Sequence, residues 1–197
     1  LLYLRLGGSY KVDISLKIDG VPADGKLMLK SGDRERPLAK GATTGSFFNT
    51  GVETGYYDLY IEDKGGVWLK VVEDVLIQND YQFTCSLYSI DVNDGENRID
   101  KNLVSYPDYS VSGKEISVRL PTEGYDCGKL TTEPSDLNVS GTDPDGTIQS
   151  SEISFAMPSE KVTLTLNGFG PKMCNIKFIY KEGEPGFKNH AGNPYTI

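Results

Sequence analysis

Residues 10–18 read YKVDISLKI, in which apolar side chains alternate with mostly polar ones. Successive side chains of a β-strand point to opposite faces, so this spacing predicts a strand with one face in a core and the other in water. The alternation recurs along the chain, bounded by Gly, Asp or Asn. The further candidate strands are residues 27–29, 57–61, 81–87, 116–120, 153–157, 162–166 and 174–180. We therefore predict an all-β fold of short antiparallel strands.

Residues 67–76, VWLKVVEDVL, fit two patterns. Their apolar positions have the spacing of a helical stripe. The β-branched valines favour strands instead, because branching at Cβ stiffens the side chain and suits a pleated sheet. We favour two strands, residues 67–71 and 75–77, that meet at a kink near Glu73 and Asp74.

A module boundary is expected near residues 90–93, where the turn-forming string DVNDG at 91–95 follows a completed alternating run. We expect two tandem small β-sandwich modules, immunoglobulin-like or prealbumin-like, over residues 8–90 and 91–180. Residues 181–197 are expected to form a polar tail or linker.

The charge and hydropathy of the chain exclude two classes of partner. Among 197 residues, 20 are Lys or Arg and 28 are Asp or Glu, so the net charge is -8. This charge repels phosphate backbones, and we predict no nucleic-acid partner. No run of 18 apolar residues occurs, so we predict no membrane span. The chain begins with an apolar stub and no Met, as expected of a segment of a longer protein with further modules.

The residues available for catalysis are few. The one histidine, His190, lies in a Gly- and Asn-containing tail, and the sequence places no pair of carboxylates across a cleft. Neither the phosphate-binding Gly-rich loop of nucleotide-binding proteins nor the dinucleotide fingerprint is present. We predict a non-enzymatic protein without a cofactor. A domain with its own activity would need a cleft with convergent carboxylates of shifted pKa.

A metal site is also not expected. Cys85, Cys127 and Cys174 are too far apart in sequence for a zinc site, and their pairing in any disulfide is open. Asp143 and Asp145, in the string DPDG, place oxygens close together, as calcium loops do, but without the ligand spacing of an EF-hand. A plain turn is the favoured interpretation, and these two residues are the candidates for a metal.

Aromatic residues supply the candidate ligand-binding positions. The chain holds 12 tyrosines and one tryptophan. Tyr56, Tyr57 and Tyr60 straddle both faces of one predicted strand, so at least one of them is expected to point outward. An exposed aromatic ring can stack on a sugar or a peptide. We predict Tyr56, Tyr57 and Trp68 as ligand-binding residues, and ordinary sandwich filling is the alternative.

Five strings of the first module occur in a specific order. They are VDISL at 12–16, DGVP at 19–22, TGSF at 44–47, TGYYDLYI at 54–61, and the paired strands through Val75 and Phe83. In this order they resemble the carboxypeptidase regulatory-like family of transthyretin-like β-sandwiches. The resemblance implies a stalk or spacer role in a secreted bacterial protein.

Residues 155–165 of the second module read FAMPSEKVTLT. This string is similar to the segment that closes each unit of bacterial surface repeats related to internalin B-repeats, although the usual Gly-Trp ahead of it is absent. Pro158 ends one strand because it lacks the N–H that a ladder needs. Both resemblances imply an extracellular or cell-surface location.

The favoured function is a non-enzymatic segment of a bacterial cell-surface or secreted protein, acting as an adhesin or spacer with an unknown protein or glycan partner. The alternative is a carbohydrate-binding accessory region of an exported polysaccharide-degrading enzyme. The two differ in one observable feature, since carbohydrate binding requires an exposed planar platform of Trp68 or of Tyr56 and Tyr57.

Overall fold

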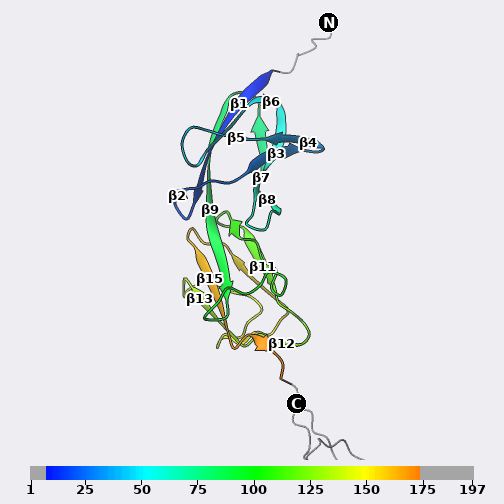
Figure 1. Cartoon of the computed structure of the whole chain (residues 1–197), viewed down its shortest axis with the longest axis vertical. Coiled ribbons are helices and arrows are strands. Elements are labelled where there is room, and N and C mark those ends of the chain that lie inside the picture. Colours follow the sequence, from blue (N-terminus) through cyan, green and yellow to red (C-terminus); the bar gives the residue numbers. More distant parts are fainter. Residues whose placement is uncertain (1–7, 174–197) are drawn as a thin grey trace, which may run out of the picture.

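The computed structural model describes residues 8–173, and this part of the chain contains strands and no helix (Figure 1). The predicted all-β class is confirmed. The strands are β1 (Ser9–Ile18), β2 (Val21–Pro22), β3 (Leu27–Ser31), β4 (Arg34–Pro37), β5 (Ala39–Lys40), β6 (Ser46–Glu53), β7 (Gly55–Glu62), β8 (Trp68–Ile77), β9 (Tyr81–Asn93), β10 (Tyr109–Ser110), β11 (Glu115–Arg119), β12 (Tyr125–Asp126), β13 (Lys129–Glu133), β14 (Glu152–Ala156), β15 (Val162–Asn167) and β16 (Gly170–Pro171).

Two sheets enclose the first group of buried side chains. Strands β9, β1, β6 and β5 lie side by side in one sheet, and β4, β3, β7 and β8 form the other. Apolar side chains alternate inward from both sheets, as in a β-sandwich. This first core consists of Val12, Ile14, Leu16, Leu27, Leu29, Leu38, Phe47, Val52, Tyr57, Leu59, Ile61, Val71, Ile77, Cys85 and Leu87.

A second group of buried side chains lies between the pair β11–β14 and the strands β13, β15 and β9. This second core consists of Ile90, Val92, Ile99, Val104, Tyr106, Ile116, Val118, Leu120, Leu130, Ile153, Phe155, Met157, Val162, Leu164 and Leu166. The two cores follow one another along the long axis of the molecule (Figure 1).

Two strand pairings correct the expectation of a purely antiparallel fold. Strand β9 runs parallel to β1, with Ile14 opposite Phe83, and parallel to β15, with Leu164 opposite Val92. The long segments between these strands in the chain allow the parallel direction, since a crossover, unlike a hairpin, can return the chain to the same end of the sheet.

Strand β9 is also longer than predicted and joins the two cores. The expected turn at 91–95 is wrong for residues 91–93, because Asp91, Val92 and Asn93 pair with β15. The turn follows directly, where the Asp94 N–H donates to the Asn97 carbonyl at 3.0 Å. No linker separates the two cores, because one continuous strand contributes to both (Figure 1).

The inward face of β9 changes between Ser89 and Ile90. Cys85 and Leu87 belong to the first core, whereas Ile90 and Val92 belong to the second. Odd-numbered and even-numbered residues of a strand point to opposite faces, so the two cores lie against opposite faces of β9. Whether the two halves fold independently stays a prediction.

Residues 68–77 form one strand, β8, in place of the two predicted strands. The predicted kink is present as a bulge within this strand. Tyr57 faces Val75 and Tyr60 faces Lys70, so five steps on β8 match three on β7. Asp74 has a positive φ of 54° there. The bulge absorbs the extra residues and lets pairing continue on both sides.

Other predicted strands are present with small changes at their ends. Strands β11, β14 and β15 correspond to the predictions at 116–120, 153–157 and 162–166, and each of their ends lies within one residue of the predicted end. The predicted strand at 174–180 and the tail at 181–197 lie outside the described residues. Within residues 8–173, no helix long and apolar enough to cross a membrane occurs.

Candidate functional site

The three predicted aromatic residues lie in different environments. Tyr56 is 61% exposed and Trp68 is partly exposed, whereas Tyr57 is only 1% exposed. Alternation along β7 sends Tyr57 into the first core and Tyr56 to the outer face. The expectation that at least one tyrosine points outward is confirmed. Tyr57 is a core residue, which corrects its assignment to ligand contact.

Tyr56 and Trp68 lie on one outer face but do not form a common platform. Trp68 pairs with Glu62, which is six residues from Tyr56 along β7. At about 3.3 Å per residue, this places the two aromatic residues about 20 Å apart. Tyr56 instead faces Leu76 across the β7–β8 pair, and Leu76 is 38% exposed. This pair is a small exposed apolar surface, and ligand binding by Tyr56 and Trp68 stays a prediction.

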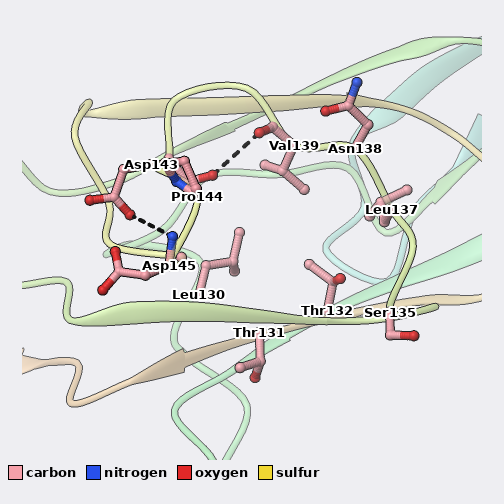
Figure 2. Close-up of a pocket in the computed structure, with 12 residues that line it drawn as sticks. Leu130, Thr131, Thr132, Ser135, Leu137, Asn138, Val139, Asp143, Pro144 and Asp145 are labelled. Carbon is pink, nitrogen blue, oxygen red and sulfur yellow. Dashed lines mark hydrogen bonds between the residues drawn. The ribbon is translucent and has the colours of Figure 1, made fainter.

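A groove of about 650 Å³ lies in the second half of the molecule, between β13 and the loop of residues 135–146 (Figure 2). Its apolar wall comes from Leu130 of the second core and from Leu137 and Val139, which pack against that core. The lining residues are Leu130, Thr131, Thr132, Ser135, Leu137, Asn138, Val139, Thr142, Asp143, Pro144, Asp145 and Gly146. No aromatic side chain lines this groove, so it lacks the stacking surface that sugars use.

The groove contains both predicted metal candidates, Asp143 and Asp145, but their oxygens already have partners. One Asp143 oxygen accepts the N–H groups of Asp145 at 3.2 Å and Thr147 at 2.8 Å, and the other accepts the Gln149 amide at 3.1 Å. Asp145 forms a salt bridge with Lys129 at 2.6 Å. This is the favoured plain turn, and Figure 2 shows the Asp143–Asp145 bond that closes it.

Across residues 8–173, no group of three or more His, Cys, Asp or Glu side chains is placed to hold a metal ion.

A buried ion network lies between the two cores. Asp108 is 1% exposed, forms a salt bridge with Arg98, and pairs with Lys101 at 2.8 Å. Its carboxylate also accepts the backbone N–H of Lys64 at 3.3 Å, from the loop between β7 and β8. The network therefore ties a loop beside the first core to the second half of the chain.

Burial alone would raise the pKa of Asp108, but hydrogen bonds and charge attraction from Lys101 and Arg98 together outweigh burial and hold this pKa below its ordinary value. The Arg98 guanidinium donates to the Tyr106 hydroxyl at 2.9 Å, and Lys101 lies 4.9 Å from the Tyr106 ring centroid. A carboxylate so placed is structural, because its negative charge is matched by two cations.

Further contacts cross the same junction. Asp19, at the end of β1, accepts the N–H of Ser89 at 2.9 Å and its hydroxyl at 2.6 Å. The Lys114 ammonium donates to the Lys70 carbonyl on β8 at 2.7 Å. The sequence pattern did not predict this junction. The one sign of it in the sequence is that the buried apolar residues of β9 change from odd-numbered to even-numbered positions.

The cysteines whose positions are described carry free thiols. Cys85 is in the first core, where burial raises the pKa of its thiol to about 12. Cys127 is half-buried, and burial together with Asp126 raises its thiol pKa. Neither thiol is therefore ionised near neutral pH. Cys174 and His190 lie outside the described residues.

Comparisons with known proteins give structural similarity only. No family model matches the chain, and no curated protein matches it. A candidate carbohydrate-binding protein from Bacteroides uniformis is similar at a TM-score of 0.33 and 13% identity, over 76% of this chain and 80% of that one. The Bacillus anthracis TIE protein is similar at a TM-score of 0.32 and 8% identity, over 80% of this chain and 34% of that one.

A DUF3823 family protein from Parabacteroides merdae gives a TM-score of 0.27 and 14% identity, over 82% and 78% of the two chains. At these TM-scores the similarities say nothing about what the chain binds. The two family resemblances read from the sequence stay predictions.

Proposed function

We propose that the chain is a non-enzymatic segment of a bacterial cell-surface or secreted protein and acts as a rigid spacer. One observation carries the proposal: β9 runs unbroken from the first core into the second. Strand β9 pairs with β1 up to Leu87 and with β15 from Ile90, and between these two ladders Tyr88 and Ser89 pair with β10. Bending β9 at the junction would break the hydrogen bonds to β10, so the strand does not act as a hinge.

The junction contacts support the same function. The Asp108 network and the Asp19–Ser89 bonds restrain rotation about β9. Strands β1 and β6 lie near one end of the long axis, and β12 and β16 lie toward the other (Figure 1). Residues 8 and 173 therefore emerge far apart, so a module joined at each would be held at a fixed separation.

Small-angle X-ray scattering tests this spacer. The full chain should scatter as one elongated particle in which the two cores keep a fixed relative orientation. Inserting Gly-Ser-Gly between Tyr88 and Ser89 should broaden the distance distribution, because it interrupts β9 between the cores. The same insertion between Gly32 and Asp33, in the open turn after β3, is the matched control and should change nothing. Scattering of the unmodified chain that requires several relative orientations of the cores would overturn the spacer proposal.

Carbohydrate binding is the second candidate, and one observation favours it. Tyr56 is 61% exposed and lies beside the exposed Leu76 on the outer face of the β7–β8 pair. A glycan array probed with the full chain tests this surface. Any glycan bound there should be lost with Tyr56→Ala and kept with Val21→Ala, a control at a similarly exposed apolar position. Equal binding by both variants would rule out the Tyr56 surface.

A further inference from the structure

The outer edge of β13 faces the groove with unpaired backbone groups. The Leu130 N–H donates to the Gly146 carbonyl at 2.8 Å, on the side away from β15. Backbone groups of alternate residues in an antiparallel strand point to the same side, so the N–H and C=O of Thr132 also point away from β15. Within residues 8–173, no hydrogen bond joins the Thr132 N–H to the loop across the groove.

Two other sheet edges are guarded against added strands. On β8, Asp74 forms the bulge and Lys114 donates to the Lys70 carbonyl at 2.7 Å. On β4 the sequence is Arg-Glu-Arg-Pro, which combines charges with a residue that cannot donate. Bulges, charges and proline are the usual protections of an edge strand. The β13 edge also ends in a charge and a proline, Glu133 and Pro134, and its first residues are bonded to the loop, so only the Thr132 N–H and C=O are open beside the groove.

One end of the groove carries the Asp143 carboxylate, which attracts the nearby Lys129 charge but forms no salt bridge with it. Asp143 accepts only neutral N–H groups and forms no salt bridge among the described residues. Asp145, by contrast, is paired with Lys129. A cationic side chain placed beside Asp143 would meet a carboxylate already held in a fixed position by its turn.

We propose that this groove binds an extended peptide as an added strand alongside β13, with a lysine or arginine of the peptide beside Asp143. The Thr132 N–H and C=O supply the main-chain hydrogen bonds, and the groove between β13 and residues 135–146 receives alternate side chains. The absence of an aromatic lining and the unpaired strand edge favour a peptide over a sugar. This inference does not depend on the spacer function.

The test begins with a phage-displayed library of random linear heptapeptides panned against the full chain. Enriched peptides are synthesised with a fluorescent label, and their dissociation constants are measured by polarisation. We expect enrichment of peptides with one Lys or Arg. In ¹⁵N-labelled protein, the Thr132 amide resonance should shift on titration, since its N–H gains a partner.

Two substitutions at one position separate main-chain from side-chain effects. Thr132→Pro removes the outward N–H and leaves the β13–β15 ladder intact, because that N–H does not take part in the ladder. It should weaken binding by about tenfold or more, the equivalent of one hydrogen bond of about 1.4 kcal/mol. Thr132→Val keeps the N–H and is the matched control. Asp143→Asn should weaken the binding of peptides that carry a cation and leave the binding of neutral peptides unchanged.

A second measurement applies if Thr132→Pro does not fold. N-methylation of each amide of the synthetic peptide leaves the protein unaltered. Strand addition predicts loss of binding when the one peptide amide that donates to the Thr132 C=O is methylated, and tolerance at its two neighbours, whose N–H groups point away from β13. No enriched peptide, equal binding by Thr132→Pro and wild type, or equal tolerance of N-methylation at every position would each overturn the proposal. So would glycan binding that shifts the same Thr132 resonance.

Discussion

Tyr57 has the largest fully buried side chain in the chain segment that the structure describes, and its hydroxyl has no hydrogen-bond partner there. A buried hydroxyl that has lost its water and gained no partner costs free energy. The ring fills the first core from β7, so the aromatic part of the residue is stabilising while the oxygen is not.

Tyr57→Phe removes only that oxygen. The free energy of unfolding should stay the same or rise by about 1 kcal/mol, because the desolvation cost disappears with the hydroxyl. Urea unfolding followed by circular dichroism measures this. Tyr57→Ala is the control and should lose about 3–5 kcal/mol by leaving a cavity. A clear loss with Tyr57→Phe would show that the hydroxyl has a partner after all.

Asp108 is the opposite case, a buried carboxylate with several partners. Its pKa lies below the ordinary value because hydrogen bonds from Lys101 and Arg98, together with their charge attraction, outweigh burial. A lowered pKa in the folded state means that the ionised carboxylate stabilises the fold. This stabilisation is complete above about pH 5 and is lost as the pH falls through the folded-state pKa.

Asp108→Asn should therefore lower the free energy of unfolding by about 1–3 kcal/mol at pH 7. The difference from wild type should shrink as the pH falls below about 4, where the carboxyl begins to bind protons in the unfolded state, and should vanish once the pH is below the lower folded-state pKa. Unfolding curves across this pH range provide the measurement. Asp33→Asn, at an exposed turn residue in no salt bridge of the described chain, is the control. A difference that grows toward acid pH would contradict a lowered pKa of Asp108 in the folded state.

Most of the strands could be predicted from their alternation, but the joining of the two cores could not. Residues 81–87 alternate at odd positions, which predicts a strand, and DVNDG at 91–95 has the composition of a turn. Composition alone does not show that β15 offers a partner to Asp91, Val92 and Asn93. That partner is distant in sequence, and its hydrogen bonds override the local turn preference.

The candidate site could likewise be predicted only in part. Alternation predicted that at least one of Tyr56, Tyr57 and Tyr60 points outward, and both Tyr56 and Tyr57 were predicted to bind a ligand, although Tyr57 fills the core. The DPDG string correctly indicated a turn, whereas the groove beside it depends on how the loop of residues 135–146 bends away from β13. Such a path follows from long-range packing and has no local sequence signal.

The bulge in β8 supplies a prediction at the same scale. Asp74 has a φ of 54°, a left-handed conformation that costs an L-residue roughly 1 kcal/mol and glycine almost nothing. Its N–H donates to the Asp58 carboxylate at 3.1 Å, and glycine keeps that donor. Asp74→Gly should leave the melting temperature unchanged or raise it slightly.

Thr84→Gly is the control for that substitution, because Thr84 is an exposed residue within β9. A glycine in a regular strand should lose about 0.5–1 kcal/mol. If both glycine variants lose the same stability, the left-handed conformation at Asp74 does not matter energetically.

For the whole molecule, β9 is a shared strand that contributes to both cores. In the first core it supplies Cys85 and Leu87 and pairs with β1. In the second it supplies Ile90 and Val92, and it is the parallel partner of β15. Any cut between the cores must therefore assign β9 to one side and take it from the other.

Fragments that include or omit β9 test whether the second core needs this shared strand. Residues 8–93 keep every first-core residue and should fold alone, with dispersed amide resonances. Residues 94–173 lose Ile90, Val92 and the strand beside β15, so they should be largely unfolded, since two fully buried side chains cost about 2–5 kcal/mol each. Residues 88–173 restore both side chains and should fold. An ordered 94–173 fragment would show that β9 is dispensable for the second core, and a disordered 8–93 fragment would mean that the two cores form a single folding unit.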